Sequence, residues 1–300
     1  MSFPEDKKVV IDTSKMSDEK ASSLNITEDA RASVWQHPSF AKSLFMGEYK
    51  SELIYPFPTQ SSEEKSIGDQ LVKEVGVVLA ETLDSDLVDE TRTIPEEAMQ
   101  GLAKIGIFSM KIPKKYGGLG LSQVNYNRVL MAIASYCGST AVLVSAHQSI
   151  GVPQPIKLFG TDEQKKRFLP LFKDGAVSAF ALTEPGVGSD PAQMETTATL
   201  NEAGTHYLIN GEKLWCTNGL IADYLVVMAC TAPKAVNGKE VKQISAFIVK
   251  GKSPGMTIKH RCDFMGIRGI QNGLIEFKDV EVAVENRILE EGKGLKIALA

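Results

Sequence analysis

The apolar residues in the first half of the chain recur with the period of a helix. Between residues 62 and 83 they form one stripe, with acidic residues on the opposite side. This spacing predicts an amphipathic α-helix that packs its apolar face against a core. The stripe consists of Ile67, Leu71, Val75, Val78 and Leu79.

Further helices are indicated by signals for their ends. Residues 93–96 and 161–164 both have the spacing of a capping box, and Ser122 is placed to cap a helix between them. Gly106 and Gly175 are placed to end helices. The first half of the chain is therefore predicted to be helical.

One stretch, residues 129–156, carries no charged side chain and is long enough to span a bilayer. Residues 137–140 interrupt it with Cys-Gly-Ser-Thr, and Gly151 and Pro153 lie near its end. Two buried helices joined by a tight turn explain this stretch better than a membrane span.

After about residue 176 the apolar period changes from about 3.6 residues to about 2. Asn210-Gly211 separates two apolar runs and predicts a hairpin turn, and Asn237-Gly238 predicts a second turn. Many short strands with turns between them are typical of a barrel or a sandwich. The predicted strands are 177–183, 194–200, 206–209, 213–217, 224–230, 243–249, 256–258 and 273–277.

The expected architecture is α+β and multidomain. Residues 1–33 are expected to form a mobile tail, 34–175 an α-helical N-terminal domain, and 176–288 a β-barrel domain. Residues 289–300 are expected to open a C-terminal helical domain that is not in this sequence. The apolar segment 38–58 is expected to lie across the helical domain.

Composition excludes several classes of protein. Hydrophobic residues make up 43% and charged residues 23% of the 300 residues, which excludes disorder of the whole chain. The 33 basic and 37 acidic residues give a net charge of −4. Because phosphate binding needs clustered positive charge, nucleic acid is not an expected partner.

The four cysteines, Cys137, Cys216, Cys230 and Cys262, are far apart, with no CxxC pair and no Cys/His cluster. Neither a metal site nor a disulfide framework is expected. The first residues lack the pattern of a signal or transit peptide, so the expected location is cytoplasmic.

Segment 180–190, FALTEPGVGSD, is the first with distinctive chemistry, since no G-x-G-x-x-G motif, P-loop, HExxH or G-x-S-x-G signature is present. A predicted strand runs into a Pro-Gly turn, where Gly186 and Gly188 leave backbone N–H groups unobstructed. The hydroxyls of Thr183 and Ser189 flank the turn. Such a loop suits an anionic or heteroaromatic ligand, and a plain turn between strands is the alternative.

Segment 211–219, GEKLWCTNG, is the second segment with distinctive chemistry. Strand alternation predicts that Trp215 and Thr217 share one face. An indole beside a hydroxyl suits a flat ring with polar edges. A core tryptophan next to a threonine that only fits the pleat is the alternative.

TEPGVGSD at 183–190 and NGEKLWCTNG at 210–219 together resemble the flavin-binding signature of the acyl-CoA dehydrogenase family. The resemblance extends from about residue 38 to the last residue and includes MGIRG and LIEFKDVEVAVENRIL, within 265–289. SFAKSLFMGEYKSELIYPFP, at 39–58, is similar to the very-long-chain branch.

The resemblance implies an FAD site in which Thr183 would bond the flavin edge, Thr217 would lie near N5, and Ser189 would also touch the acyl-CoA. At residues 269–272 the chain has Gly-Ile-Gln-Asn where relatives usually carry small hydroxyl residues, which leaves the local CoA contacts open. The implied FAD-binding residues are Phe180, Ala181, Leu182, Thr183, Gly186, Gly188, Ser189, Trp215, Cys216 and Thr217.

The resemblance also implies an activity. The expected reaction is FAD-dependent α,β-dehydrogenation of fatty acyl-CoA to trans-2-enoyl-CoA in β-oxidation, with an electron-transfer flavoprotein as acceptor and a homodimer or homotetramer as the assembly. An acyl-CoA oxidase that uses oxygen, or a non-catalytic flavin-binding assembly protein of the same fold, are the alternatives.

No catalytic residue is assigned within the chain. In the family the base is a glutamate of the C-terminal helical domain, which would lie beyond residue 300. Glu184 is expected to be structural, His147 to be a core histidine, and Arg268 and His260 to be surface charges rather than partners of CoA phosphates. We expect the chain to be the first half of a longer subunit, and a half-size subunit completed by a partner chain is the alternative.

Overall fold

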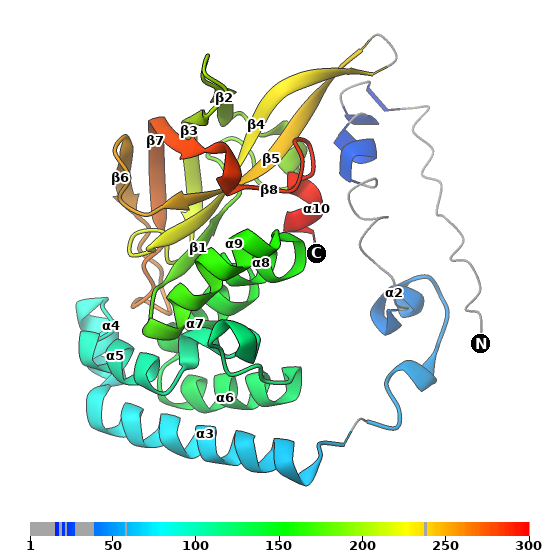
Figure 1. The fold of residues 1–300 in the computed structure, drawn as a ribbon. Coiled ribbons are helices and arrows are strands. Elements are labelled where there is room, and N and C mark those ends of the chain that lie inside the picture. The colour runs from blue at the N-terminus through cyan, green and yellow to red at the C-terminus, as the bar shows by residue number, and fades with distance from the viewer. Residues whose placement is uncertain are drawn as a thin grey trace.

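The computed structural model describes residues 16–17, 20–21, 23–27, 39–57, 59–236 and 239–299. Helices form the first half of the chain and strands most of the second (Figure 1), which confirms the expected helical domain followed by a β domain. The helices are α2 (Phe40–Phe45), α3 (Ser62–Thr82), α4 (Ser85–Thr91), α5 (Glu96–Lys104), α6 (Gln123–Tyr136), α7 (Gly138–Ser149), α8 (Pro153–Phe159), α9 (Asp162–Phe168) and α10 (Gly294–Ala298). The strands are β1 (Ser178–Ala181), β2 (Thr197–Leu200), β3 (His206–Cys216), β4 (Tyr224–Val236), β5 (Lys239–Lys250), β6 (Met256–Arg261), β7 (Gly273–Ala283) and β8 (Arg287–Ile288).

The helical domain is built on α3, whose apolar stripe faces a core. Leu71, Val75 and Leu79 are buried there, among residues of α5, α6 and α7. The uncharged stretch 129–156 forms the second part of α6 and all of α7, with Cys137 between them as predicted, and it also includes the start of α8. No helix in the described part of the chain is long and apolar enough to cross a membrane.

The predicted helix starts are confirmed at two of three sites, and both predicted stops lie just beyond a helix: Gly106 (φ +81°) after α5 and Gly175 (φ +94°) after the 3-10 helix Leu169–Asp174. The capping box of α9 is formed by Thr161 and Gln164, and Ser122 caps α6. At residues 93–96 the capping box is wrong, because Pro95 takes the N-cap position of α5 and offers no side-chain acceptor. The Thr93 hydroxyl instead donates to the Thr91 carbonyl, at 3.3 Å.

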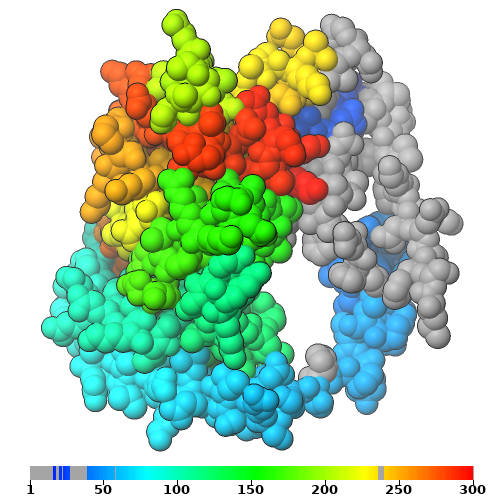
Figure 2. All heavy atoms as spheres, viewed as in Figure 1, coloured from blue at the N-terminus to red at the C-terminus, as the bar shows by residue number. Residues whose placement is uncertain are grey.

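Segment 39–57 stands away from the helical domain instead of lying across it (Figures 1 and 2). Helix α2 has no buried residue, and the Phe45 side chain is 92% exposed. The expectation was wrong because apolar composition does not determine which surface covers a segment: Tyr49, Tyr55 and Phe57 are also more than two-thirds exposed.

The β domain is one eight-stranded sheet in the order β6-β7-β3-β2-β4-β5-β8, with β1 parallel to β4. Because β6 and β8 lie at its two ends and do not pair with each other, the sheet is open, and the predicted barrel is corrected in this respect. One face packs against α8, α9 and α10 around Val226, Met228, Ile244 and Leu295. Most pairs are antiparallel, which fits the alternating sequence pattern.

The hairpin turn predicted at Asn210-Gly211 does not exist, because both residues lie inside the continuous strand β3. The pairing of β3 with β7 shifts register between Ile209 and Gly211, so the pair forms a β-bulge. Gly211 has φ +146°, a value that side chains rarely adopt. The second predicted turn, Asn237-Gly238, lies outside the described residues.

Most of the tail predicted for residues 1–33 lies outside the described residues. Residues 23–27 are helical. Ser23 is buried and donates a hydrogen bond to Asp190, and Ile26 packs against the core beneath the sheet. At the other end, Gly292 (φ +78°) turns the chain into α10, as predicted.

Candidate functional site

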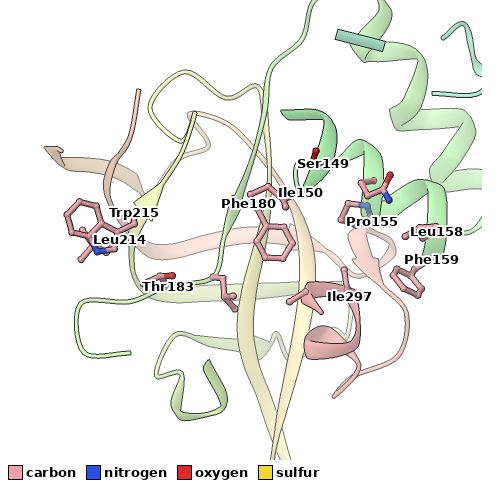
Figure 3. Close-up of a pocket in the computed structure, with 13 residues that line it drawn as sticks. Ser149, Ile150, Pro155, Leu158, Phe159, Phe180, Thr183, Leu214, Trp215 and Ile297 are labelled. Carbon is pink, nitrogen blue, oxygen red and sulfur yellow. The ribbon is translucent and has the colours of Figure 1, made fainter. Parts of the chain in front are cut away.

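A cavity of about 270 Å³ opens where the ends of α7, β1 and β3 meet α8 and α10 (Figure 3). Its walls are mostly apolar, and Ser149, Gln154 and Thr183 supply side-chain polar groups. Such a composition is typical of small-molecule sites. The lining residues are Ser149, Ile150, Gln154, Pro155, Leu158, Phe159, Phe180, Leu182, Thr183, Leu214, Trp215, Ile297 and Ala298.

Both sequence motifs contribute to this cavity. Phe180, Leu182 and Thr183 come from the first and Trp215 from the second. The two segments run side by side, since the Leu214 N–H donates to the Thr183 carbonyl at 2.8 Å. In Figure 3, Thr183 and Phe180 lie between Trp215 at one end and Phe159 at the other.

Six of the ten predicted site residues do not line the cavity, and two of these six lie in the core. Ala181 and Cys216 are buried, and the Cys216 thiol lies 3.5 Å from the Phe180 carbonyl. Burial raises the pKa of the Cys216 thiol to about 12, so this side chain stays a neutral thiol in the core.

Trp215 has an unusual backbone conformation. Its φ is +58°, which is rare for a bulky residue, and β3 breaks register with β7 between Lys213 and Cys216. The indole is 54% exposed and lies against the Phe264 ring, with centroids 5.8 Å apart. Strained backbone of this kind often marks a functional site.

The same break separates Trp215 from Thr217. Because β3 ends at Cys216, Thr217 lies beyond the strand, and the predicted shared face is wrong. The Thr217 hydroxyl oxygen accepts a hydrogen bond from the side-chain amide of buried Asn272 at 2.9 Å. A hydroxyl that accepts in this way keeps its own hydrogen for a ligand.

The glycine loop after Thr183 is open to solvent. A Cβ atom added to Gly186 or Gly188 would meet nothing within 4 Å, so a ligand can approach this backbone closely. Within the described part of the chain, the N–H groups of Gly186, Gly188 and Ser189 donate to no other residue. The loop therefore offers free donors beside the cavity.

Glu184, within this loop, is held by a buried ion pair. Its carboxylate lies 2.7 Å from the ammonium of Lys213 and accepts the N–H groups of Glu195 and Thr196. Burial alone would raise the pKa of Glu184, but Lys213 and the N–H donors lower it below its ordinary value. Burial lowers the pKa of Lys213, against the attraction of Glu184.

The other titratable candidates lie away from the cavity. His147 is buried and hydrogen-bonded to the Phe108 carbonyl and to Ser178, as expected for a core histidine. Burial lowers its pKa to about 4. Arg268 contacts Asp89 at 3.4 Å, and His260 is exposed.

The sequence did not indicate the far wall of the cavity. Leu158 and Phe159 of α8 and Ile297 of α10 are ordinary apolar helix residues with no chemical signature. Only the packing of α8 and α10 on the sheet brings them to the motifs.

Comparison with protein families gives two adjacent matches. Residues 67–176 match the model described as acyl-CoA dehydrogenase, N-terminal domain, and residues 179–280 match acyl-CoA dehydrogenase, middle domain. The boundary between the matches coincides with the start of β1.

Individual proteins agree with these matches. The chain is 48% identical over 285 residues to probable acyl-CoA dehydrogenase FadE10 of Mycobacterium tuberculosis, covering 95% of this chain and 43% of the relative. It is 35% identical over 264 residues to the mitochondrial very long-chain specific acyl-CoA dehydrogenase of Rattus norvegicus, covering 87% of this chain and 40% of that protein. Among solved structures, an acyl-CoA dehydrogenase from Bacillus anthracis complexed with FAD has a TM-score of 0.70 and 34% identity, covering 84% of this chain and 41% of that one. The chain thus spans less than half the length of these relatives.

Proposed function

This chain belongs to the acyl-CoA dehydrogenase family, and we propose that it holds FAD for the α,β-dehydrogenation of a fatty acyl-CoA thioester to a trans-2-enoyl-CoA. The chain carries the N-terminal and middle domains of the family.

The observation that carries the proposal is the meeting of the two motifs at one cavity. An exposed indole on a strained backbone and Thr183 line the cavity, and the glycine loop with its free N–H groups directly follows Thr183 in the chain. The aromatic face fits a flat ring, and the hydroxyl and N–H groups fit its polar edge and a phosphate. The relative from Bacillus anthracis, solved with FAD, supports the choice of ligand.

The flavin, when bound, supplies the acceptor for the hydride that leaves the β-carbon of the thioester. This chain's own residues would bind and orient the flavin. Trp215 provides a face for the ring, Thr183 and Thr217 provide hydroxyl groups, and the apolar walls formed by Phe180 and Leu182 exclude water.

Neither buried candidate in the chain can act as the base that removes the α-proton. The Glu184 carboxylate is occupied by Lys213 and two backbone donors, and His147 lies in the core with a pKa lowered to about 4 by burial. We propose that the base lies on a further domain, as the greater length of the relatives suggests.

Titration of the purified full chain with FAD, followed by flavin fluorescence, tests the cofactor. We expect saturable quenching and about fivefold weaker binding for Trp215→Ala, because stacking on an aromatic ring contributes about 1 kcal/mol. Leu200→Ala, at a half-exposed position on β2, is the matched control. Equal affinity of the Trp215→Ala variant and the wild type would contradict the proposed site.

The substrate class and the electron acceptor are tested on the FAD-loaded protein. In a subunit that carries the proposed further domain with its base, anaerobic titration with acyl-CoAs of graded length should shift or bleach the flavin spectrum, and an unchanged spectrum with every length would refute the substrate class. We propose an electron-transfer flavoprotein as acceptor and a homodimer or homotetramer as the assembly. Rapid reoxidation by air would instead indicate an oxidase.

A further inference from the structure

Lys213 is a buried charge for which the proposed function has no use. Its side chain is 0% exposed, although lysine is almost never fully buried without a partner. Replacing a buried ion pair by uncharged groups is often neutral or stabilising, so stability alone does not explain the pair. Its contacts point to a different role.

The ammonium of Lys213 makes two contacts on either side of one residue. It donates to the Leu182 carbonyl at 3.1 Å and to the Glu184 carboxylate at 2.7 Å. Thr183 lies between these two anchored residues, and its carbonyl accepts the N–H of Leu214, which follows Lys213. The backbone on both sides of Thr183 is therefore tied to β3.

The carboxylate of Glu184 extends these ties to a third segment. It accepts the N–H of Glu195 at 2.7 Å and the N–H of Thr196 at 3.0 Å, just before β2 begins. Glu184 also pairs through its backbone with Val187, which closes the tight turn at Pro185 and Gly186 within the glycine loop. One ion pair thus joins the glycine loop, β3 and the start of β2.

We infer that Lys213 and Glu184 form a positioning pair, which holds Thr183 and the glycine loop in register with Trp215 so that both motifs contact one ligand. Lys213 precedes Trp215 by two residues on the same strand, so the pair sets the separation between the threonine and the indole. This role rests on the proposed FAD site and extends it. Neither side chain lines the cavity, and both are buried.

The variants are Lys213→Met, Glu184→Gln and the two combined. The single changes leave a buried polar group without its partner, while the combined change removes both charges. Lys259→Met removes a comparable charge from the exposed Lys259–Glu276 pair between β6 and β7 and serves as the control.

The first readouts are the Kd for FAD, the visible circular dichroism of bound flavin and the denaturation midpoint. We expect the combined variant to recover a midpoint near that of wild type, yet to bind FAD at least tenfold more weakly and with altered dichroism. A merely structural pair would instead recover binding together with stability. Wild-type Kd and dichroism in the combined variant would overturn the inference.

Amide hydrogen exchange of the ligand-free protein tests the pair without any cofactor. We expect exchange at Val187, Glu195 and Thr196, whose N–H groups donate to Glu184, to rise at least tenfold in the combined variant, with β6 and β7 unchanged. Unchanged exchange across the loop would overturn the inference even if FAD binds. Failure of the wild type to bind FAD, with faster loop exchange in the variant, would refute the proposed function and leave the positioning role standing.

Discussion

Gly211→Ala tests the β-bulge that replaced the predicted hairpin turn. At φ +146° a side chain is strained, and backbone outliers of this kind cost about 1–3 kcal/mol. An added Cβ would also lie 2.5 Å from the Thr196 hydroxyl and 2.8 Å from the Thr196 Cα. Because that backbone cannot move freely, overpacking adds about 1–3 kcal/mol. We therefore expect the free energy of unfolding to fall by about 2–6 kcal/mol.

The matched control is Gly204→Ala, in an exposed turn before β3. Gly204 also has a positive φ, +68°, but an added Cβ would meet nothing within 4 Å. Its expected cost is about 1 kcal/mol, since only the left-handed backbone is penalised. Urea denaturation of both variants measures the difference between their free energies of unfolding. The comparison uses the same dependence of that free energy on urea concentration for both variants.

A hairpin turn at Asn210-Gly211 would make the two substitutions equally mild, because nothing would pack against the turn. Equal midpoints would therefore refute the bulge and the close approach of Thr196. If Gly211→Ala loses more stability than Gly204→Ala, amide exchange at Thr196, whose N–H donates to Glu184, should also become faster.

Three further predictions concern single side chains. Because burial lowers the pKa of His147 from 6.5 to about 4, the unfolded chain binds its proton more readily between these values. The free energy of unfolding should fall by about 3 kcal/mol as the pH drops through this window, and denaturation of His147→Gln should lack that slope. Asn272→Ala removes the amide that donates to Thr217, and a lost hydrogen bond of about 1 kcal/mol should weaken FAD binding about fivefold; an unchanged Kd by fluorescence would contradict the role of Asn272. Since burial raises the pKa of Cys216 to about 12, iodoacetamide should label it only after denaturation, and mass spectrometry showing adducts on the native protein would contradict its burial.

Local signals explain where prediction from the sequence succeeded. The stripe of α3 and the caps at Ser122 and Thr161 depend on residues within four positions of one another, so the sequence displays them directly. The capping box at 93–96 failed for an equally local reason, the proline at position 95.

Contacts between distant residues explain where prediction failed. Asn-Gly favours a tight turn in isolation, yet Gly211 continues β3, because the strand pairs with β2 and β7 and a glycine is needed beside Thr196. The left-handed backbone conformation of Trp215 likewise interrupts the strand alternation, which was expected to put Trp215 and Thr217 on the same face. Segment 39–57 was misplaced because apolar composition does not say which surface, if any, will cover it.

The sequence by itself determined the order of a helical and a β domain, the two motifs and, through resemblance, the family, since these depend on local periodicity and contiguous residues. Tertiary structure alone decided that Lys213 binds the residues on both sides of Thr183 and that the Asn272 side chain donates a hydrogen bond to Thr217. It also decided that α8 and α10 complete the cavity. The physical reason is that burial and pairing of polar groups arise between segments that are far apart along the chain, and only the folded packing brings them together.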